Sequence, residues 1–128
     1  MAHEVSYTVY YEDTDASGVV YYASYFRLLE RGRSEYVKAH GRSVSQWASD
    51  GVHVMVHSVE ASFRKPAKLM DTLDVITSFT LVSPYRGRFV QRIDKGVERV
   101  VDATVDVVCV DRGQQLQEFP VEFAALED

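Results

Sequence analysis

The spacing of hydrophobic positions changes at about residue 50. Between residues 22 and 40, apolar and aromatic side chains recur every three or four positions, which predicts one long helix. The apolar side of this helix consists of Tyr22, Tyr25, Phe26, Leu29, Tyr36 and Val37. Ahead of it, residues 4–11 alternate and predict a strand, with Val5, Tyr7, Val9 and Tyr11 on one face.

Beyond residue 50 the hydrophobic positions follow a period of two. This pattern predicts strands over residues 52–63, 72–82, 88–94 and 97–110. A change of phase near Ser58 predicts a bulge in the first of these strands. The last two strands are expected to form a hairpin around Asp94-Lys95-Gly96, and Pro120 to open a short tail with a turn of helix.

This order of elements predicts an α+β fold. One long helix precedes four or more strands joined by short turns, and the alternation typical of a doubly wound parallel sheet is absent from the pattern. The simplest arrangement is a curved, mostly antiparallel sheet wrapped around residues 22–40. Gly32 lies on the apolar side of the helix, where glycine weakens an isolated helix, so we expect the helix to approach the sheet closely there.

Length and composition narrow the class of protein. The 128 residues fit a single domain spanning residues 1–128, because domains commonly have about 100–200 residues. The net charge of -5 disfavours nucleic-acid binding, since such proteins are usually basic. Without an apolar run near the roughly 18 residues of a membrane helix, or the pattern of a signal peptide, we expect a cytoplasmic protein with no membrane insertion. The lone Cys109 and four scattered histidines predict no metal site.

The acidic segment before the long helix is the best candidate for chemistry. Glu12, Asp13 and Asp15 lie within four residues, and Gly18 follows. A solvated turn that caps the helix is one interpretation. The apolar residues 19–22 favour another, in which Asp15 lies at the mouth of an apolar pocket. A carboxylate can attack a carbonyl or activate water, and the free N–H groups of a helix start can stabilise the oxyanion, so together they could form an acyl-transfer site.

These residues also resemble a known family. The segment from Tyr11 to Tyr25, YEDTDASGVVYYASY, with Glu30-Arg31 further on, strongly resembles the hotdog-fold acyl-CoA thioesterases. The likeness is greatest to the 4-hydroxybenzoyl-CoA thioesterase group and its YbgC-like branch, and it extends over nearly the whole chain. It implies a hotdog fold and the hydrolysis of a small acyl-CoA, short-chain aliphatic or aromatic, to the free acid and CoA.

The resemblance also implies roles for particular residues. The family's catalytic aspartate falls on Asp15, as nucleophile or as general base, and the backbone N–H that polarises the thioester carbonyl falls on Tyr22. Gly18 holds the turn between them, and we interpret Asp13 as structural. Many YbgC-like members carry histidine where Tyr22 stands, but a backbone role does not depend on the side chain.

Binding of CoA requires local positive charge. Arg64 and Lys65 form one basic segment, while Tyr85, Arg86 and Arg88 form another in a tight turn. The resemblance favours the second segment, although a solvated turn is the alternative for both. Val19 and Tyr25 are further candidate substrate contacts, and the aromatic residues near the helix start either line the acyl pocket or fill the core. CoA belongs to the substrate, so no cofactor is implied.

Two other functions fit this fold. A non-catalytic module that binds acyl-CoA or an acyl-carrier protein is the main alternative, disfavoured because a half-buried Asp15 without a task would be costly. A hydratase or dehydratase of the same fold would carry a histidine-containing motif, which this sequence lacks. The short chain, and the family's placement of sites between subunits, imply a homodimer or homotetramer.

Overall fold

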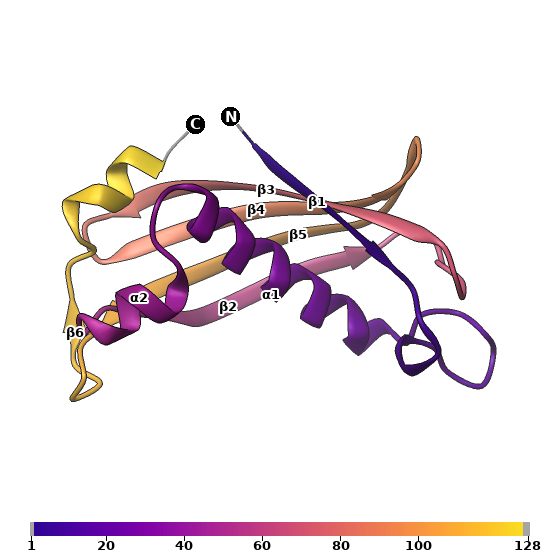
Figure 1. The fold of residues 1–128 in the computed structure, drawn as a ribbon, viewed down its shortest axis with the longest axis horizontal. Helices are drawn as coiled ribbons and strands as arrows, with labels where there is room; N and C mark the ends of the chain where they lie inside the picture. The colour runs from indigo at the N-terminus through magenta and orange to yellow at the C-terminus, as the bar shows by residue number, and fades with distance from the viewer. Residues whose placement is uncertain (1, 127–128) are drawn as a thin grey trace.

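The structure is a computed structural model, and it describes residues 2–126. Its elements, in chain order, are β1 (His3–Thr8), η1 (Tyr11–Asp13), α1 (Tyr22–Ala39), α2 (Val44–Ser49), β2 (His53–Phe63), β3 (Thr72–Ser83), β4 (Arg86–Lys95), β5 (Glu98–Val110), β6 (Leu116–Gln117) and η2 (Val121–Leu126). The long helix α1 lies across one face of the sheet, while α2 and η2 lie near one end of the sheet (Figure 1).

All pairings in the sheet are antiparallel, in the order β1-β3-β4-β5-β2, with the short β6 added to β5. The predicted α+β arrangement is therefore confirmed. The register of β2 on β5 shifts between Val56 and Ser58, which confirms the predicted bulge. Because β2 is last in the order, one of its edges is unpaired within residues 2–126.

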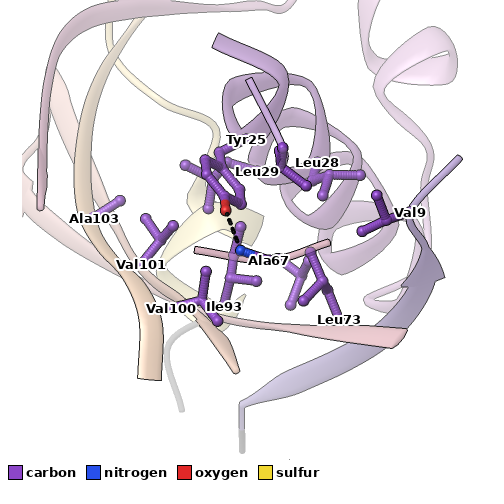
Figure 2. Packing of buried hydrophobic residues seen from close by; sticks show 12 residues of the cluster. Val9, Tyr25, Leu28, Leu29, Ala67, Leu73, Ile93, Val100, Val101 and Ala103 are labelled. Carbon is purple, nitrogen blue, oxygen red and sulfur yellow. Dashed lines mark hydrogen bonds between the residues drawn. The ribbon is translucent and has the colours of Figure 1, made fainter. Parts of the chain in front are cut away.

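The core forms where α1 packs on the sheet. Tyr25, Leu28 and Leu29 of α1 lie against a layer of strand residues that includes Leu73, Ile93 and Val101 (Figure 2). The close approach expected at Gly32 is also present. A Cβ atom at this position would lie 2.6 Å from Val75 Cγ1, so only glycine fits without displacement.

Two local predictions were wrong. The first strand ends at Thr8, and Tyr11, which we expected on the same strand face as Val5, lies in η1 with 82% of its surface exposed. The helix α2 was missed, because six residues are too few to establish a helical period. Its start carries a capping box, in which Ser43 Oγ accepts from Gln46 N at 3.1 Å and Gln46 Oε1 accepts from Ser43 N at 2.8 Å.

Candidate active site

Asp13 links the acidic segment to the rest of the fold through hydrogen bonds. Its side chain is buried, and its Oδ2 accepts from the N–H of Tyr10 at 2.9 Å. Its Oδ1 accepts from Arg27 Nη2 at 3.0 Å, which ties the segment to the first turns of α1. The N–H of Tyr21 donates to the Asp13 carbonyl at 2.9 Å. Asp13 thus bonds to chain on both sides of the hairpin that follows it.

Asp15 and Gly18 form the tip of a small hairpin that leads into α1. Thr14 pairs with Val20 at its base, and the N–H of Gly18 donates to the Asp15 carbonyl at 3.0 Å. Gly18 has a φ of 80°, which an L side chain rarely adopts. The Asp15 carboxylate accepts from the N–H of Ser17 at 2.8 Å. Asp15 is exposed in the single chain. The argument that a half-buried Asp15 without a catalytic task would be costly, which disfavoured a non-catalytic binding module, therefore does not hold for the single chain.

The hairpin is followed directly by the start of α1 at Tyr22. Tyr21 precedes the helix and gives no side-chain cap. The first N–H with a local partner is that of Ser24, which donates to the Tyr21 carbonyl at 2.8 Å. Across residues 2–126, no hydrogen-bond acceptor is found for the N–H of Tyr22. This group is therefore available to an oxygen outside the chain, and the helix dipole favours negative charge there.

Aromatic rings surround Phe63, at the end of β2 beside this helix start. The rings of Tyr22, Tyr25 and Phe26 lie 5.9, 5.8 and 6.1 Å from that of Phe63, centroid to centroid. Tyr25 is buried and its hydroxyl accepts from the N–H of Ala67 at 3.3 Å (Figure 2). Burial raises the pKa of this hydroxyl, which keeps it protonated at neutral pH. Tyr22, Phe26 and Phe63 stay partly exposed, so this aromatic cluster offers an apolar surface next to the Tyr22 N–H.

A separate pocket of about 220 Å³ lies between α1 and the sheet. Its walls are mostly apolar and include Val54 and Val56 of β2. Glu30, Arg33 and Ser34 of α1 are the polar residues of its lining. Neither Phe63 nor Arg33 was singled out from the sequence. Their positions depend on the packing of β2 beside α1, a contact between segments that are distant in the sequence.

The two basic segments lie at different places. Arg64 and Lys65 follow Phe63 directly and pair with Asp102 and Glu98 respectively. Phe63 aligns with Val101 on β5, whereas Arg86 aligns with Val108. Seven residues of strand separate these positions, about 24 Å. Within one chain, the 85–88 turn is thus remote from the Asp15 hairpin (Figure 1).

Arg88 is already engaged by a carboxylate. Its Nε and Nη2 donate to the two oxygens of Asp106 at 2.7 and 3.1 Å. These bonds hold the pKa of the Asp106 carboxyl below its usual value. Tyr85 is half exposed, and Arg86 lies at the first position of β4. Arg86 is therefore better placed than Arg88 to meet a phosphate.

Comparison with known proteins places the chain in a family. The model of the thioesterase-like superfamily matches residues 9–126. The acyl-CoA thioester hydrolase YbgC of Escherichia coli O6:H1 is 39% identical over 104 residues, which are 80% of this chain and 78% of that protein. The acyl-CoA thioesterase YbgC of Haemophilus influenzae is 36% identical over 107 residues, covering 83% and 79% of the two chains.

Solved structures show the same fold. The 1,4-dihydroxy-2-naphthoyl-CoA thioesterase of Synechocystis superposes with a TM-score of 0.90 at 19% identity, over 98% of this chain and 95% of that one. The chain belongs to the thioesterase-like superfamily, and the predicted hotdog fold is confirmed. The prediction of a thioester hydrolase is confirmed by the same membership.

The described residues hold neither a candidate metal site nor a helix that could span a membrane. No group of three or more histidine, cysteine, aspartate or glutamate side chains that could hold a metal ion occurs within residues 2–126. No helix in that range is long and apolar enough to cross a membrane.

Proposed function

We propose that this protein hydrolyses acyl-CoA thioesters at the site formed by the Asp15 hairpin and the start of α1. The observation that carries the proposal is the N–H of Tyr22, which has no acceptor within residues 2–126, lies beside exposed aromatic rings and follows a hairpin with an exposed carboxylate at its tip. Membership of the thioesterase-like superfamily and the acyl-CoA thioesterase activity of the YbgC relatives support the same reaction.

The thioester carbonyl oxygen accepts the N–H of Tyr22. Negative charge grows on this oxygen as the carbonyl carbon becomes tetrahedral, and the helix start stabilises that charge. Asp15 acts by one of two routes. As a general base it takes a proton from water while the water oxygen attacks the carbon. As a nucleophile its own oxygen attacks and gives an anhydride, which water then hydrolyses. In both routes the C–S bond breaks, and CoA leaves as a thiolate that takes up a proton.

The site is completed in this proposal by a second copy of the chain. The free edge of β2 is eleven residues long and exposes Met55, Val56, Val59 and Phe63. Such an edge readily pairs with another strand. Antiparallel pairing of two β2 strands about a two-fold axis sets the start of one strand beside the end of the other. The partner's 85–88 turn then lies toward the Asp15 end, where Arg86 can meet the CoA phosphates.

Initial-rate hydrolysis tests the proposal. Free thiol is measured with short-chain, long-chain and aromatic acyl-CoAs for the wild type, Asp15→Asn and Glu12→Gln. We expect Asp15→Asn to lower kcat at least about a hundredfold, in the range of general acid–base catalysis, while the thermal midpoint stays unchanged. Glu12 is an exposed carboxylate three positions earlier, and we expect its loss to leave turnover unchanged.

Two results would count against the proposal. Full turnover by Asp15→Asn would move the chemistry to another residue. Binding of acyl-CoA without hydrolysis of any substrate would favour the non-catalytic module.

A further inference from the structure

Arg27 joins α1 to the acidic segment that carries Asp15. Its Nη2 donates to Asp13 Oδ1 at 3.0 Å and to Ser24 Oγ at 3.3 Å. The other side-chain hydrogen bonds described for residues 10–17 stay within that segment. Arg27 was not singled out from the sequence, because neither the acidic motif nor the helical pattern indicates that the two segments meet at this residue.

Asp13 is attached to the start of α1 at two points. Its carbonyl accepts from the N–H of Tyr21, the residue before the helix, at 2.9 Å. Its carboxylate accepts from Arg27, in the second turn of the helix. A single hydrogen bond would let the segment rotate about that bond, whereas two bonds to one helix fix its orientation. Asp15 follows two residues later, so this orientation also sets the direction of Asp15 relative to the N–H of Tyr22.

The two arms of the hairpin are held by different parts of the fold. On the returning arm, the N–H of Val20 donates to the Ala67 carbonyl at 2.8 Å, and Val19 pairs with Lys68. This arm is thus attached to the segment that follows β2. The outgoing arm begins at Asp13, and its side-chain attachment to α1 is the bond from Arg27.

Arg27 contributes little to the core. Its side chain is 51% exposed, whereas that of Asp13 is 10% exposed, and ion pairs with an exposed partner add little to stability. Removing Arg27 also leaves the bond from the Tyr10 N–H to Asp13 in place. A reaction depends more steeply on geometry, because a displacement of about 1 Å can cost about a hundredfold in rate. Loss of Arg27 should therefore affect turnover more than stability.

We propose that Arg27 is a positioning residue for the hydrolysis. Acting through Asp13, it holds the Asp15 carboxylate where it can act on the thioester carbon while the carbonyl oxygen accepts from the N–H of Tyr22. This inference rests on the proposed function for the roles of Asp15 and Tyr22. Arg27 acts through another residue and does not contact the reacting atoms, so substrate affinity should not depend on it.

Steady-state kinetics separates positioning from substrate binding. Rates per folded molecule are measured for the wild type, Arg27→Met and Arg27→Lys with the acyl-CoA that the wild type hydrolyses fastest. We expect Arg27→Met to lower kcat at least about tenfold and to leave KM within about twofold of the wild type. Arg27→Lys should recover most of kcat, because a single nitrogen of Arg27 contacts Asp13 and an ammonium group can replace it.

Arg92 provides the matched control. It pairs with Asp94 at 3.2 Å on β4, and its side chain is 47% exposed, so Arg92→Met removes a similar ion pair elsewhere in the fold. This variant should keep the wild-type kcat. A raised KM with unchanged kcat in Arg27→Met would make Arg27 a substrate contact. A lowered thermal midpoint with full turnover per folded molecule would make it a purely structural residue. Either result would overturn the inference.

A double variant tests the route through Asp13. Asp13→Asn keeps an oxygen for the N–H of Tyr10 but removes the charge that Arg27 contacts. If Arg27 acts through Asp13, adding Arg27→Met to Asp13→Asn should lower kcat little further. Losses that multiply in the double variant would show that Arg27 acts by another route, against the inference.

Amide hydrogen exchange gives a measurement that does not require turnover. The N–H groups of Asp15 and Gly18 are bonded within the hairpin, so looser attachment should speed exchange over residues 14–20 in Arg27→Met but not in Arg92→Met. Unchanged exchange would overturn the inference. If the wild type hydrolyses no acyl-CoA, the proposed function is refuted, and exchange still decides whether Arg27 fixes the hairpin. If hydrolysis depends on Asp15 but not on Arg27, only the inference fails.

Discussion

Asp13 and Asp15 are two positions apart in the chain, but their side chains have different surroundings. Asp13 is buried and bonded to Arg27 and to the backbone of Tyr10. Asp15 is exposed, and within residues 2–126 its carboxylate accepts one hydrogen bond, from the N–H of Ser17. Buried charges in proteins are usually paired, whereas a reactive carboxylate must keep an oxygen free. The environment therefore favours a structural role for Asp13 and is compatible with the catalytic role proposed for Asp15.

Replacing Asp13 with alanine should destabilise the protein. The change leaves the N–H of Tyr10 and the guanidinium of Arg27 without their acceptor, and we expect a loss of about 1–3 kcal/mol in the free energy of unfolding. Urea unfolding measures the loss. Glu12→Ala is the matched control, because Glu12 is an exposed neighbour, and its midpoint should stay near that of the wild type. Equal midpoints for the two variants would show that Asp13 does not fasten the segment.

The hairpin from Thr14 to Val20 depends on one backbone conformation. Gly18 has a φ of 80°, with no atom within 4 Å of where a Cβ would stand, so alanine there meets strain but no clash. We expect Gly18→Ala to cost about 1 kcal/mol of stability and to lower kcat by shifting Asp15.

Gly51 gives a close control for this substitution. Its φ is 81°, and the contacts of an added Cβ are ordinary at 3.8 Å or more. Gly51→Ala should lower the thermal midpoint by a similar amount, but its turnover per folded molecule should match the wild type. If Gly18→Ala also keeps full turnover, the geometry of the hairpin does not matter for the reaction.

Periodicity predicted the long elements well, because α1 and the strands β3 to β5 each bury one repeating face, and β2 keeps apolar residues on one face although that face is largely exposed. It failed where a segment is too short to repeat, as in α2 and η1, although Ser43 and Gln46 form a recognisable capping pair. The residues of the candidate site also differ in whether the sequence could predict them. Asp15 and Gly18 belong to one local motif and were proposed from the sequence, whereas Phe63 contacts Tyr22 only because β2 returns beside the start of α1. A local pattern carries no information about such a long-range contact.

The whole molecule has its basic turn and its acidic hairpin at opposite ends of the sheet (Figure 1). One chain alone therefore separates Arg86 from Asp15, and two chains paired through β2 bring the partner's Arg86 to the Asp15 end. The exposed apolar residues of β2 would be covered in the same step. The dimer of the proposed function would therefore account for both the free sheet edge and the position of the basic turn.

Mixed dimers test this arrangement directly. Asp15→Asn lacks the reactive carboxylate, and Arg86→Glu should bind CoA poorly, so each homodimer should be nearly inactive at substrate concentrations below KM. A dimer of one chain of each kind has one site with Asp15 and the partner's Arg86 both intact. Random mixing by coexpression should therefore restore about a quarter of the wild-type rate.

The alternatives predict different outcomes. If Arg86 served the site of its own chain, every site of a mixed dimer would carry a defect, and coexpression would restore nothing. Sedimentation of the separate variants must first show that each forms dimers, since a monomer at micromolar concentration would by itself refute pairing through β2. Lys38→Glu is the control for charge reversal, because Lys38 is exposed in the last turn of α1. Its homodimer should keep the wild-type rate, so that loss of activity in Arg86→Glu reports the position of that residue at the partner's site.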